Sequence, residues 1–509
     1  MRGFYTSLIQ ALASVLLALS LTAAPALAED APSRTAPAAA HAPPLPADSV
    51  THHDITLDGR KLAYTATAGS LPLKDEHGQD TAEIFYVSFT RDGVEDAAHR
   101  PTTYVFNGGP GASAAYLDIG ALGPRVLALD PDGRPPQSER IIDNAATWLP
   151  FTDLVFIDPV GTGYSAAAGG EDAAAKQFWG VRQDLDSLAE IIRLHLTRAG
   201  RLAAPVYLVG ESYGGFRAAR LADALGRDPG VAPAGVVLIS PALEFRLMSG
   251  DRVDVLSWAL RLPSYAAAAL AAQGKLTADA LAGAEHFALT DYLTALAAGP
   301  PDGPAAQQLY ARLAALTGLD EAAIARWQGR IPLGGYVRDA RRGAGEIISP
   351  YDATVGSTDP NPWNGEAHDD PVLDASVAPF TRGFVAYARD ELGFKTDLPF
   401  KLLNGEVSRR WDWSSGRGGG SRGTLGASDA LARALALQPR LKVMIAHGMT
   451  DLLTPYMMSR YVADHLPAAE RGRVALKLYD GGHMMYLRAS SRQRLHDDAQ
   501  AFYAAAPAD

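Results

Sequence analysis

Short apolar runs and helical stretches alternate along the first part of the chain. The apolar runs are rich in Val, Ile, Leu and aromatic residues and cover residues 102–106, 153–158, 205–209 and 235–239. Between the second and third runs, apolar residues over 178–198 recur every three or four positions, as on one face of an amphipathic helix. Strands that are separated by helices pair in parallel through right-handed crossovers. The pattern therefore predicts a mostly parallel central sheet flanked by helices.

An antiparallel hairpin is predicted ahead of this alternation. Residues 55–57 and 61–64 flank Asp58-Gly59, a pair that favours a tight turn between two strands. Residues 82–90 are expected to form a further strand.

The alternation stops at about residue 245. Residues 245–430 are Ala-rich and helical at first, then irregular with many Gly and Pro residues. Strand patterns return over 441–446 and 474–479, and a C-terminal helix follows. The simplest architecture is one α/β core, residues 49–244 and 431–509, interrupted by a helical insertion that lies where a lid over an active site would sit.

The N-terminus has the pattern of a secretory signal over residues 1–28. Arg2 precedes an apolar stretch over 8–21, and Ala26-Leu27-Ala28 offers a small-residue cleavage site. The alternative is an N-terminal membrane anchor, but the cleavage site and the Ala/Pro-rich linker over 29–48 favour removal. We expect an exported protein, periplasmic or secreted, with no membrane partner after cleavage.

Composition narrows the possible functions. A formal net charge of -11 argues against nucleic acid as the main partner, because a phosphate backbone is bound by a basic face. The chain has no cysteine, which excludes a Cys nucleophile and thiolate metal sites. A serine nucleophile is compatible with this composition.

The segment Gly210-Glu211-Ser212-Tyr213-Gly214 fits the nucleophile-elbow pattern G-x-S-x-G. It lies between a predicted strand and a predicted helix, where the chain must turn sharply and the glycines allow close backbone packing. The helix N-terminus directs free N–H groups at the serine oxygen. Ser212 is therefore the candidate nucleophile.

A serine nucleophile needs a base and an orienting acid, which in this fold follow the serine in the order acid, then histidine. Asp451 comes just after the strand 441–446, and His483 comes just after the strand 474–479. Both lie at carboxyl ends of strands, where α/β sheets place their sites. They are the candidate acid and base.

Other residues compete for these roles. His447 precedes the acid, and His465 and His496 lie in helical stretches, so His483 is favoured. Asp480 is the rival acid, but it is only three residues from His483. His447 and Asp451 as metal ligands would lack a third ligand nearby, so no metal or other cofactor is expected.

An oxyanion hole requires backbone N–H donors fixed near the nucleophile. One is expected from Tyr213 and the other from the glycine-rich loop over 107–111. The alternative for this loop, a phosphate-binding turn, lacks the Lys-Ser/Thr pair and the G-x-G-x-x-G spacing. Glu211 is a poor neighbour for a developing anion when ionised, but when protonated it can donate a hydrogen bond to a bound anion. The alternative interpretation is that Glu211 is a solvated residue with no role in binding.

These segments together resemble the serine carboxypeptidase family (peptidase family S10), in a bacterial branch. The matching motifs cover residues 107–113, 123–124, 158–165, 210–215, 448–451 and 482–484. The resemblance implies the α/β-hydrolase fold and a triad of Ser212, Asp451 and His483. It further implies oxyanion donors on Gly109 and Tyr213, and binding of the free C-terminal carboxylate of a peptide by Asn107, Gly108 and Glu211.

Two departures from the family pattern affect this expectation. The family usually places a second Glu, which shares a proton with the first, at the position of Ala121 here. Asp118 could substitute only if its loop turned differently. The family's disulfides are absent. Because the second glutamate is missing, we expect a smaller rise in the pKa of Glu211 and a weaker acid optimum or carboxylate preference.

The leading hypothesis is a serine-type carboxypeptidase that hydrolyses the C-terminal peptide bond of peptides through an acyl-enzyme on Ser212. An esterase or acyltransferase of the same fold is the alternative, motivated by Ala121 and the unmatched segment 245–430. A non-catalytic exported binding protein is a third. The sequence indicates neither the oligomeric state nor the preferred substrate residues.

Overall fold

The computed structural model describes residues 44–134, 139–227, 230–299, 301–363, 369–414 and 421–505. The predicted signal over residues 1–28 lies outside the described residues, as do residues 29–43 of the predicted linker over 29–48. In the part of the chain that is described, no helix is both long and apolar enough to cross a bilayer.

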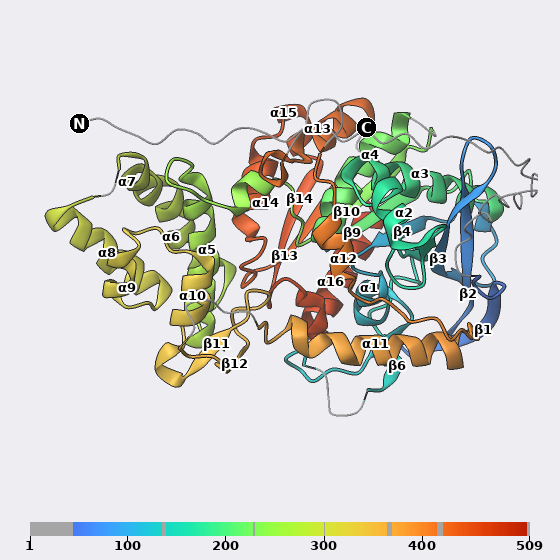
Figure 1. Cartoon of the computed structure of the whole chain (residues 1–509), viewed down its shortest axis with the longest axis horizontal. Helices are drawn as coiled ribbons and strands as arrows, with labels where there is room; N and C mark the ends of the chain where they lie inside the picture. The colour runs from blue at the N-terminus through green and yellow to red at the C-terminus, as the bar shows by residue number, and fades with distance from the viewer. Residues whose placement is uncertain are drawn as a thin grey trace, which may run out of the picture. The chain divides into compact units, whose positions relative to one another are not determined.

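A large twisted sheet forms the centre of the molecule (Figure 1). Its strands follow the order β1-β2-β3-β7-β4-β9-β10-β13-β14, and β8 pairs with β3. They are β1 (Ser49–Leu57), β2 (Arg60–Lys74), β3 (Asp80–Arg91), β4 (Thr102–Phe106), β7 (Asp153–Ile157), β8 (Ala166–Ala167), β9 (Val206–Glu211), β10 (Pro233–Ile239), β13 (Lys442–Gly448) and β14 (Val474–Tyr479). The strands from β7 to β14 in this order all run parallel, whereas β1, β2 and β3 are antiparallel. The predicted mostly parallel sheet is confirmed.

The predicted hairpin joins β1 to β2. Leu57 pairs with Arg60, so the loop is the two residues Asp58 and Gly59. Both have positive φ, 49° and 75°, the conformation whose twist matches that of the flanking strands.

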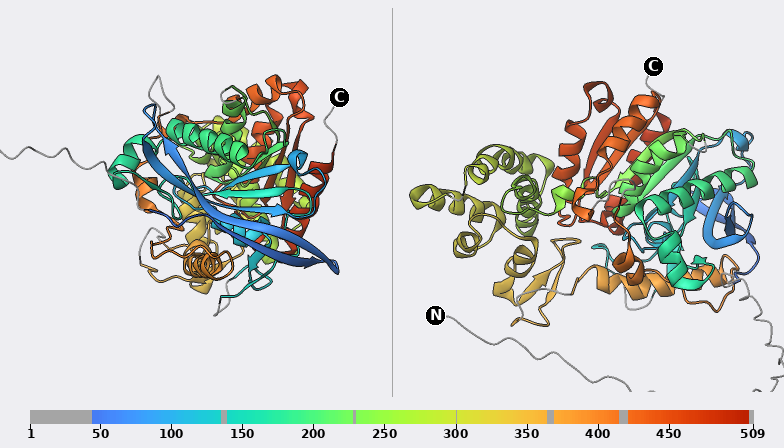
Figure 2. Two further views of the ribbon diagram at one scale, coloured as in Figure 1. Left: turned by 90° about the vertical axis from the view of Figure 1, so that its right-hand side faces the viewer. Right: turned by 45° about the horizontal axis from the view of Figure 1, so that its top comes forward.

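Helices cover both faces of the sheet (Figure 2). The main ones are α3 (Val181–Arg198), α4 (Tyr213–Arg227), α13 (Ser428–Leu437) and α14 (Tyr456–Asp464) on one face, with α11 (Leu373–Asp390) and α16 (Ala489–Ala504) on the other. Successive residues of β10 alternate between two hydrophobic clusters, Val236 in the first and Val237 in the second. Because both faces are buried, the parallel strands are continuous apolar runs.

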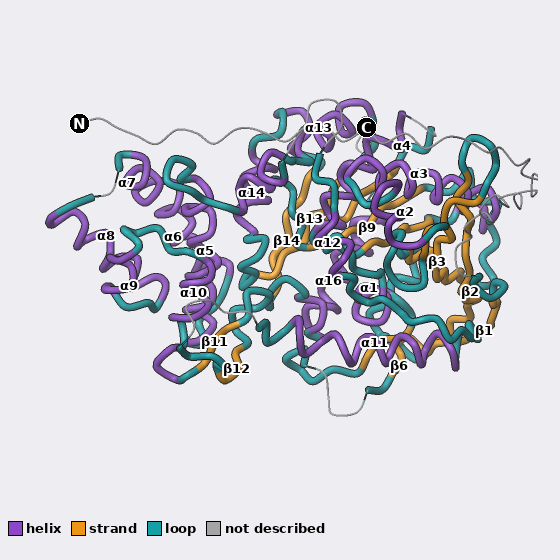
Figure 3. The backbone as a smooth tube through the Cα atoms, viewed as in Figure 1, coloured by secondary structure: helices purple, strands orange, loops and turns teal. Residues whose placement is uncertain are grey.

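Between β10 and β13, the described residues add no strand to the large sheet. The first part of this stretch is mostly helical, with loops between the helices (Figure 3). It comprises α5 (Leu256–Ala272), α6 (Ala278–Phe287), α7 (Leu293–Ala297), α8 (Gly303–Thr317), α9 (Glu321–Arg326) and α10 (Leu333–Asp339). We call residues 256–339 the helical segment. These helices supply most of a third hydrophobic cluster, in which Tyr265 and Tyr336 stack with ring centroids 4.0 Å apart. Leu260 of α5 and Leu281 of α6 belong instead to the first cluster, in the core.

The second part of the stretch behaves differently. After the small sheet of β11 (Glu346–Ile348) and β12 (Gly356–Thr358), α11 packs Phe380 and Phe384 into the cluster beneath the large sheet. Farther along, Lys401 and Asp412 form isolated bridges with core loops. The helical segment therefore supplies most of a third hydrophobic cluster while α5 and α6 also pack into the first, whereas residues 373–414 and 421–426 are built onto the α/β core.

Shorter elements complete the chain. They are α1 (Ala115–Leu117), the π-helical turn η2 (Asp118–Leu122), β5 (Arg125–Leu127), β6 (Ile141–Asp143), α2 (Gly170–Gln177), α12 (Gly405–Arg410), α15 (Ala468–Arg471) and the 3-10 turns η1 (Ala97–His99), η3 (Phe245–Met248), η5 (Arg342–Ala344), η6 (Arg422–Thr424) and η7 (Met485–Leu487), together with the π-helical turn η4 (Ala288–Tyr292).

Candidate active site

Ser212 occupies the sharp turn between β9 and α4, as the elbow motif predicts. Its φ is 59°, in the left-handed region that a non-glycine residue rarely adopts. The side chain is partly exposed and forms no hydrogen bond with a described residue, while its neighbours on both sides are buried. The turn therefore presents the hydroxyl at the surface of an otherwise buried loop.

The elbow, residues 210–214, packs directly against the end of β4, and its glycines make this close packing possible. An ideal Cβ on Gly210 would overlap the carbonyl oxygen of Gly214, and one on Gly214 would lie 2.6 Å from the carbonyl oxygen of Phe106. Neither position has room for a side chain. This packing brings the loop after β4 next to Ser212.

Asp451 and His483 lie side by side at the ends of β13 and β14, which are adjacent parallel strands. His483 Nδ1 is 2.8 Å from Asp451 Oδ2, and both side chains are buried. The backbone N–H groups of Leu453 and Thr454 donate to Asp451 Oδ1 at 2.8 and 3.0 Å, and the Thr454 hydroxyl donates to Oδ2 at 2.7 Å. The carboxylate is thus fixed from several directions.

The charges of this pair support one another. Burial lowers the pKa of His483, but the Asp451 carboxylate outweighs burial and holds that pKa above its ordinary value. Burial raises the pKa of Asp451, and His483 reverses this, so the pKa of the acid lies below its usual range. An ionised acid beside a basic imidazole is the arrangement that general-base catalysis requires.

The competing residues are in unsuitable environments. His447 is fully buried, its Nε2 bonded to the Ser459 hydroxyl at 2.8 Å, and burial lowers its pKa to about 4. Asp480 is exposed and forms no side-chain hydrogen bond with a described residue. Neither is hydrogen-bonded to His483, so the geometry brings together Asp451 and His483 as expected.

The glycine-rich loop after β4 meets the elbow at Gly108. An ideal Cβ at this position would lie 2.7 Å from the backbone nitrogen of Tyr213 and 2.9 Å from Ser212 Cβ. Only a glycine can lie so close to the nucleophile. Gly109 follows with φ of 101°, which again requires glycine. The two predicted oxyanion donors, on Gly109 and Tyr213, therefore come from loops that are in contact.

A buried ion pair supports this loop from behind. Arg217 of α4 donates to Asp184 of α3 at 2.7 Å and to the carbonyl oxygen of Asn107 at 2.6 Å. Both charged side chains are almost completely buried, at 1% and 4% exposure. Sequence patterns did not identify this pair, because its members are 33 residues apart on two helices.

Glu211 is buried, which excludes the solvated alternative. Asn107 Nδ2 donates to Glu211 Oε2, and the Tyr486 hydroxyl donates to Oε1 at 3.0 Å. Asn107 Oδ1 accepts from the backbone N–H of Leu117 at 3.0 Å, which orients its amide. Burial raises the pKa of the Glu211 carboxyl, and His483, Tyr486 and Asn107 each oppose that rise.

Asp118 does not substitute for the missing second glutamate. It is 1% exposed, its oxygens have no hydrogen-bond partner among the described residues, and it lies against Gly123. Burial and then Asp158 raise its pKa far above the usual range. Tyr486 is the group that contacts Glu211 instead. Tyr486 carried no functional signal in the sequence, since a lone aromatic residue after a motif is typical of a core position.

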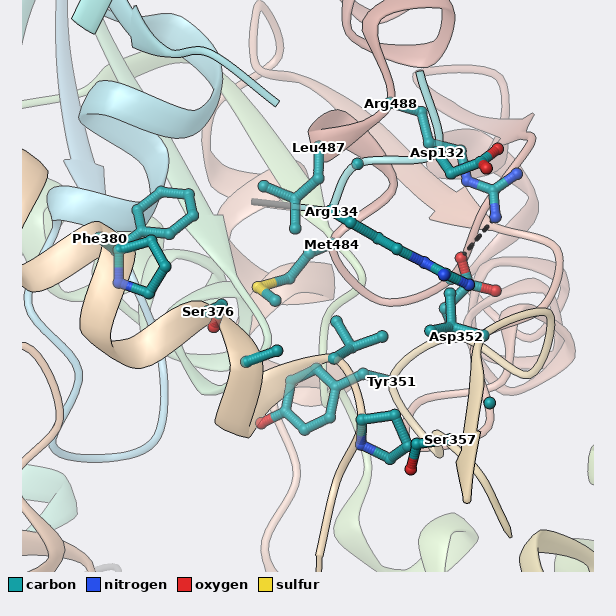
Figure 4. A pocket seen from close by; sticks show the side chains of 18 of the residues that line it. Asp132, Arg134, Tyr351, Asp352, Ser357, Ser376, Phe380, Met484, Leu487 and Arg488 are labelled. Carbon is teal, nitrogen blue, oxygen red and sulfur yellow. Dashed lines mark hydrogen bonds and ion pairs between the residues drawn. The ribbon is translucent and has the colours of Figure 1, made fainter. Parts of the chain in front are cut away.

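A cavity of about 430 Å³ lies next to the base (Figure 4). Gly482 and Met484, the neighbours of His483, line it, and so does Tyr351, whose ring packs edge-on against His483 at 5.1 Å. Met484 and Leu487 form part of an apolar wall, with Arg488 paired to Asp352 at 2.9 Å on the other side. The cavity has room for a side chain of a substrate.

A family model described as serine carboxypeptidase matches residues 60–229. Serine carboxypeptidase-like 29 of Arabidopsis thaliana is 31% identical over 166 residues, which are 32% of this chain and 32% of that protein. The resemblance to the serine carboxypeptidase family is confirmed. The pheromone-processing carboxypeptidase KEX1 of Candida tropicalis is 24% identical over 162 residues, 31% of this chain and 20% of that protein. The matched part thus spans about a third or less of these family relatives.

The fold comparison extends further along the chain. A prohormone-processing carboxypeptidase from Saccharomyces cerevisiae superposes with a TM-score of 0.54, covering 86% of this chain and 91% of that one at 15% identity. At this identity the likeness concerns the fold, and the expected α/β-hydrolase fold is confirmed. The bacterial branch stays a prediction.

Proposed function

We propose that the chain is a serine-type carboxypeptidase that hydrolyses the C-terminal peptide bond of peptides through an acyl-enzyme on Ser212. The observation that carries the proposal is the buried carboxyl of Glu211, held by Asn107 directly beside the nucleophile. A buried carboxyl in this position suits an enzyme whose substrate has a carboxylate next to the scissile bond.

The proposed acylation starts at Ser212. His483 Nε2 accepts the hydroxyl proton as the oxygen attacks the carbonyl carbon, and Asp451 holds Nδ1 protonated and stabilises the imidazolium. The backbone N–H groups of Gly109 and Tyr213 donate to the developing oxyanion. His483 then returns the proton to the leaving amine, and water attacks the acyl-enzyme by the reverse sequence.

Recognition of the free C-terminus is assigned to Asn107, Gly108 and Glu211. The Asn107 amide donates hydrogen bonds, and Gly108 allows the substrate carboxylate to approach the backbone. Glu211 donates only when protonated, because two ionised carboxylates in a buried site repel each other. The proposed enzyme therefore binds free acids better as the pH falls toward the range in which Glu211 holds its proton.

A blocked dipeptide and its C-terminal amide, compared between pH 4 and pH 8, test this proposal. We expect faster cleavage of the free acid, a preference that declines as pH rises, and complete loss of both activities in Ser212→Ala. Equal cleavage of acid and amide, or cleavage of neither, would contradict carboxylate recognition. Activity on simple esters without peptide cleavage would instead indicate the esterase alternative.

Export is also proposed, from the signal pattern over residues 1–28. N-terminal sequencing of the protein from its native cells is expected to find a chain that begins at Glu29. A chain that retains the apolar stretch over 8–21 would contradict cleavage.

A further inference from the structure

The contact between Tyr486 and Glu211 joins two parts of the site that are far apart in sequence. Tyr486 belongs to η7, three residues after His483, and its hydroxyl donates to Glu211 Oε1 at 3.0 Å. Both side chains are buried. The tyrosine therefore contacts the proposed carboxylate-binding group from the loop that holds the base.

The ring of Tyr486 also has a defined packing contact, in addition to the hydrogen bond of its hydroxyl. An ideal Cβ on Gly120 would lie 3.4 Å from Cε2 of Tyr486, so the ring lies against the turn η2, next to Ala121. A second glutamate at position 121 would extend from this same turn. The phenol thus approaches Glu211 beside the turn from which that second carboxyl is missing.

Few titratable groups surround Glu211. The charges of His483 and Asp451 act on the pKa of Glu211, and the charge of Glu211 in turn acts on the pKa values of Tyr116 and Tyr351. Asn107 and Tyr486 are the donors to its two oxygens, and no second carboxyl is hydrogen-bonded to it among the residues described. A carboxyl with one donor on each oxygen is stabilised in its ionised form.

We propose that Tyr486 is a positioning residue that sets the protonation range of Glu211, and thereby the highest pH at which the enzyme accepts substrates with a free carboxylate. The assignment rests on the carboxypeptidase function proposed above. A second carboxyl would share the proton of Glu211, whereas a phenol donates a hydrogen bond to the anion. With Tyr486 present, Glu211 loses its proton at a lower pH than it would without the donor.

Tyr486→Phe tests this assignment because it removes the donor and keeps the ring against Gly120. Loss of one hydrogen bond to the anion is expected to raise the pKa of Glu211, and so to move the alkaline limb of kcat/KM for free-acid peptides upward by about 0.5–1 pH unit. The limb measured with the corresponding ester or amide is expected to stay in place. An unchanged or lowered limb for the free acid, or an equal shift for both substrates, would overturn the proposal.

Tyr116→Phe is the matched control. Tyr116 is another buried tyrosine near Glu211, but its hydroxyl bonds to Ser376 at 3.0 Å rather than to the glutamate. We expect this variant to retain the wild-type limb. In a Glu211→Gln background, Tyr486→Phe is expected to have no effect on the limb, since the titrating group is gone. A shift of the limb in Tyr116→Phe, or on adding Tyr486→Phe to Glu211→Gln, would also overturn the proposal.

Direct titration of Glu211 separates this inference from the proposed function. The infrared band of the protonated Glu211 carboxyl, assigned by its loss in Glu211→Gln, gives a midpoint without any substrate. We expect a higher midpoint in Tyr486→Phe than in the wild type. An unchanged midpoint overturns the role of Tyr486. A raised midpoint in an enzyme that cleaves acid and amide equally would instead overturn the proposed carboxylate recognition.

Discussion

The buried polar groups in two regions of this molecule, one edge of the large sheet and the helical segment, are satisfied in different ways. At the carboxyl ends of β4, β9, β13 and β14, which we call the catalytic edge, buried side chains bond to one another across elements, as Asp451 does with His483. In the helical segment, the buried tyrosine hydroxyls donate to backbone carbonyls. Tyr292 donates to Gly329 at 2.6 Å, and Tyr336 donates to Tyr265 at 3.1 Å.

This difference has a functional meaning. At the catalytic edge, the charge of each group depends on its partner, so a single substitution changes the chemistry of its neighbours. In the helical segment, each of the buried tyrosine hydroxyls is satisfied by a backbone acceptor that carries no titratable charge. Substitutions there should change the free energy of unfolding and little else. The following predictions test that contrast, in order of decreasing effect.

Asp451→Asn should have the largest effect. The amide cannot stabilise the imidazolium of His483 and favours the wrong tautomer, so kcat for a peptide substrate is expected to fall by about 10³–10⁴-fold. Asp480→Asn is the control, since Asp480 is exposed, and it should retain wild-type kcat. A similar loss in both variants would mean that the acid has been assigned wrongly.

Arg217→Met should produce the largest loss of stability. It leaves the buried Asp184 carboxylate without its partner and the carbonyl oxygen of Asn107 without its donor. We expect the free energy of unfolding in urea to fall by about 3–5 kcal/mol. Adding Asp184→Leu should restore part of that loss, because it removes the unpaired charge. A double variant less stable than Arg217→Met would contradict this account.

Asp118→Asn should stabilise the protein, increasingly so at higher pH. Burial raises the pKa of Asp118, so the folded state holds a proton that the unfolded state releases, and its contribution to stability is lost as pH rises from about 4. At pH 8 we expect a gain of about 1–3 kcal/mol in the free energy of unfolding, shrinking toward pH 4.5. Urea titrations at both pH values measure it. A variant whose stability falls with pH as steeply as the wild type would contradict the prediction.

Tyr292→Phe should have the smallest effect. It removes one hydrogen bond to a backbone carbonyl and is expected to cost about 1 kcal/mol of stability. Neither kcat nor the pH profile should change. A shift in the pH profile would show that the helical segment is coupled to the catalytic edge, against the contrast drawn here.

The features of this protein that could be predicted from sequence are those with a periodic or local signal. The parallel strands were predictable because buried strands in such sheets are continuous apolar runs, and the elbow because its glycines flank a serine between a strand and a helix. Asp451 and His483 followed from strand order, since residues after adjacent parallel strands meet at one edge. The packing of residues 373–414 onto the core carried no such signal.

For this protein, the sequence by itself determined the order of the elements and the residue types that can act at the catalytic edge. The tertiary structure alone decided that Tyr486 contacts Glu211, that Asp118 lies against Gly123 and is not hydrogen-bonded to Glu211, and that Arg217 pairs with Asp184 while donating to Asn107. The reason is physical. Periodicity reports which face of an element is buried, but contacts between side chains depend on how distant elements pack and which hydrogen bonds remain available to them.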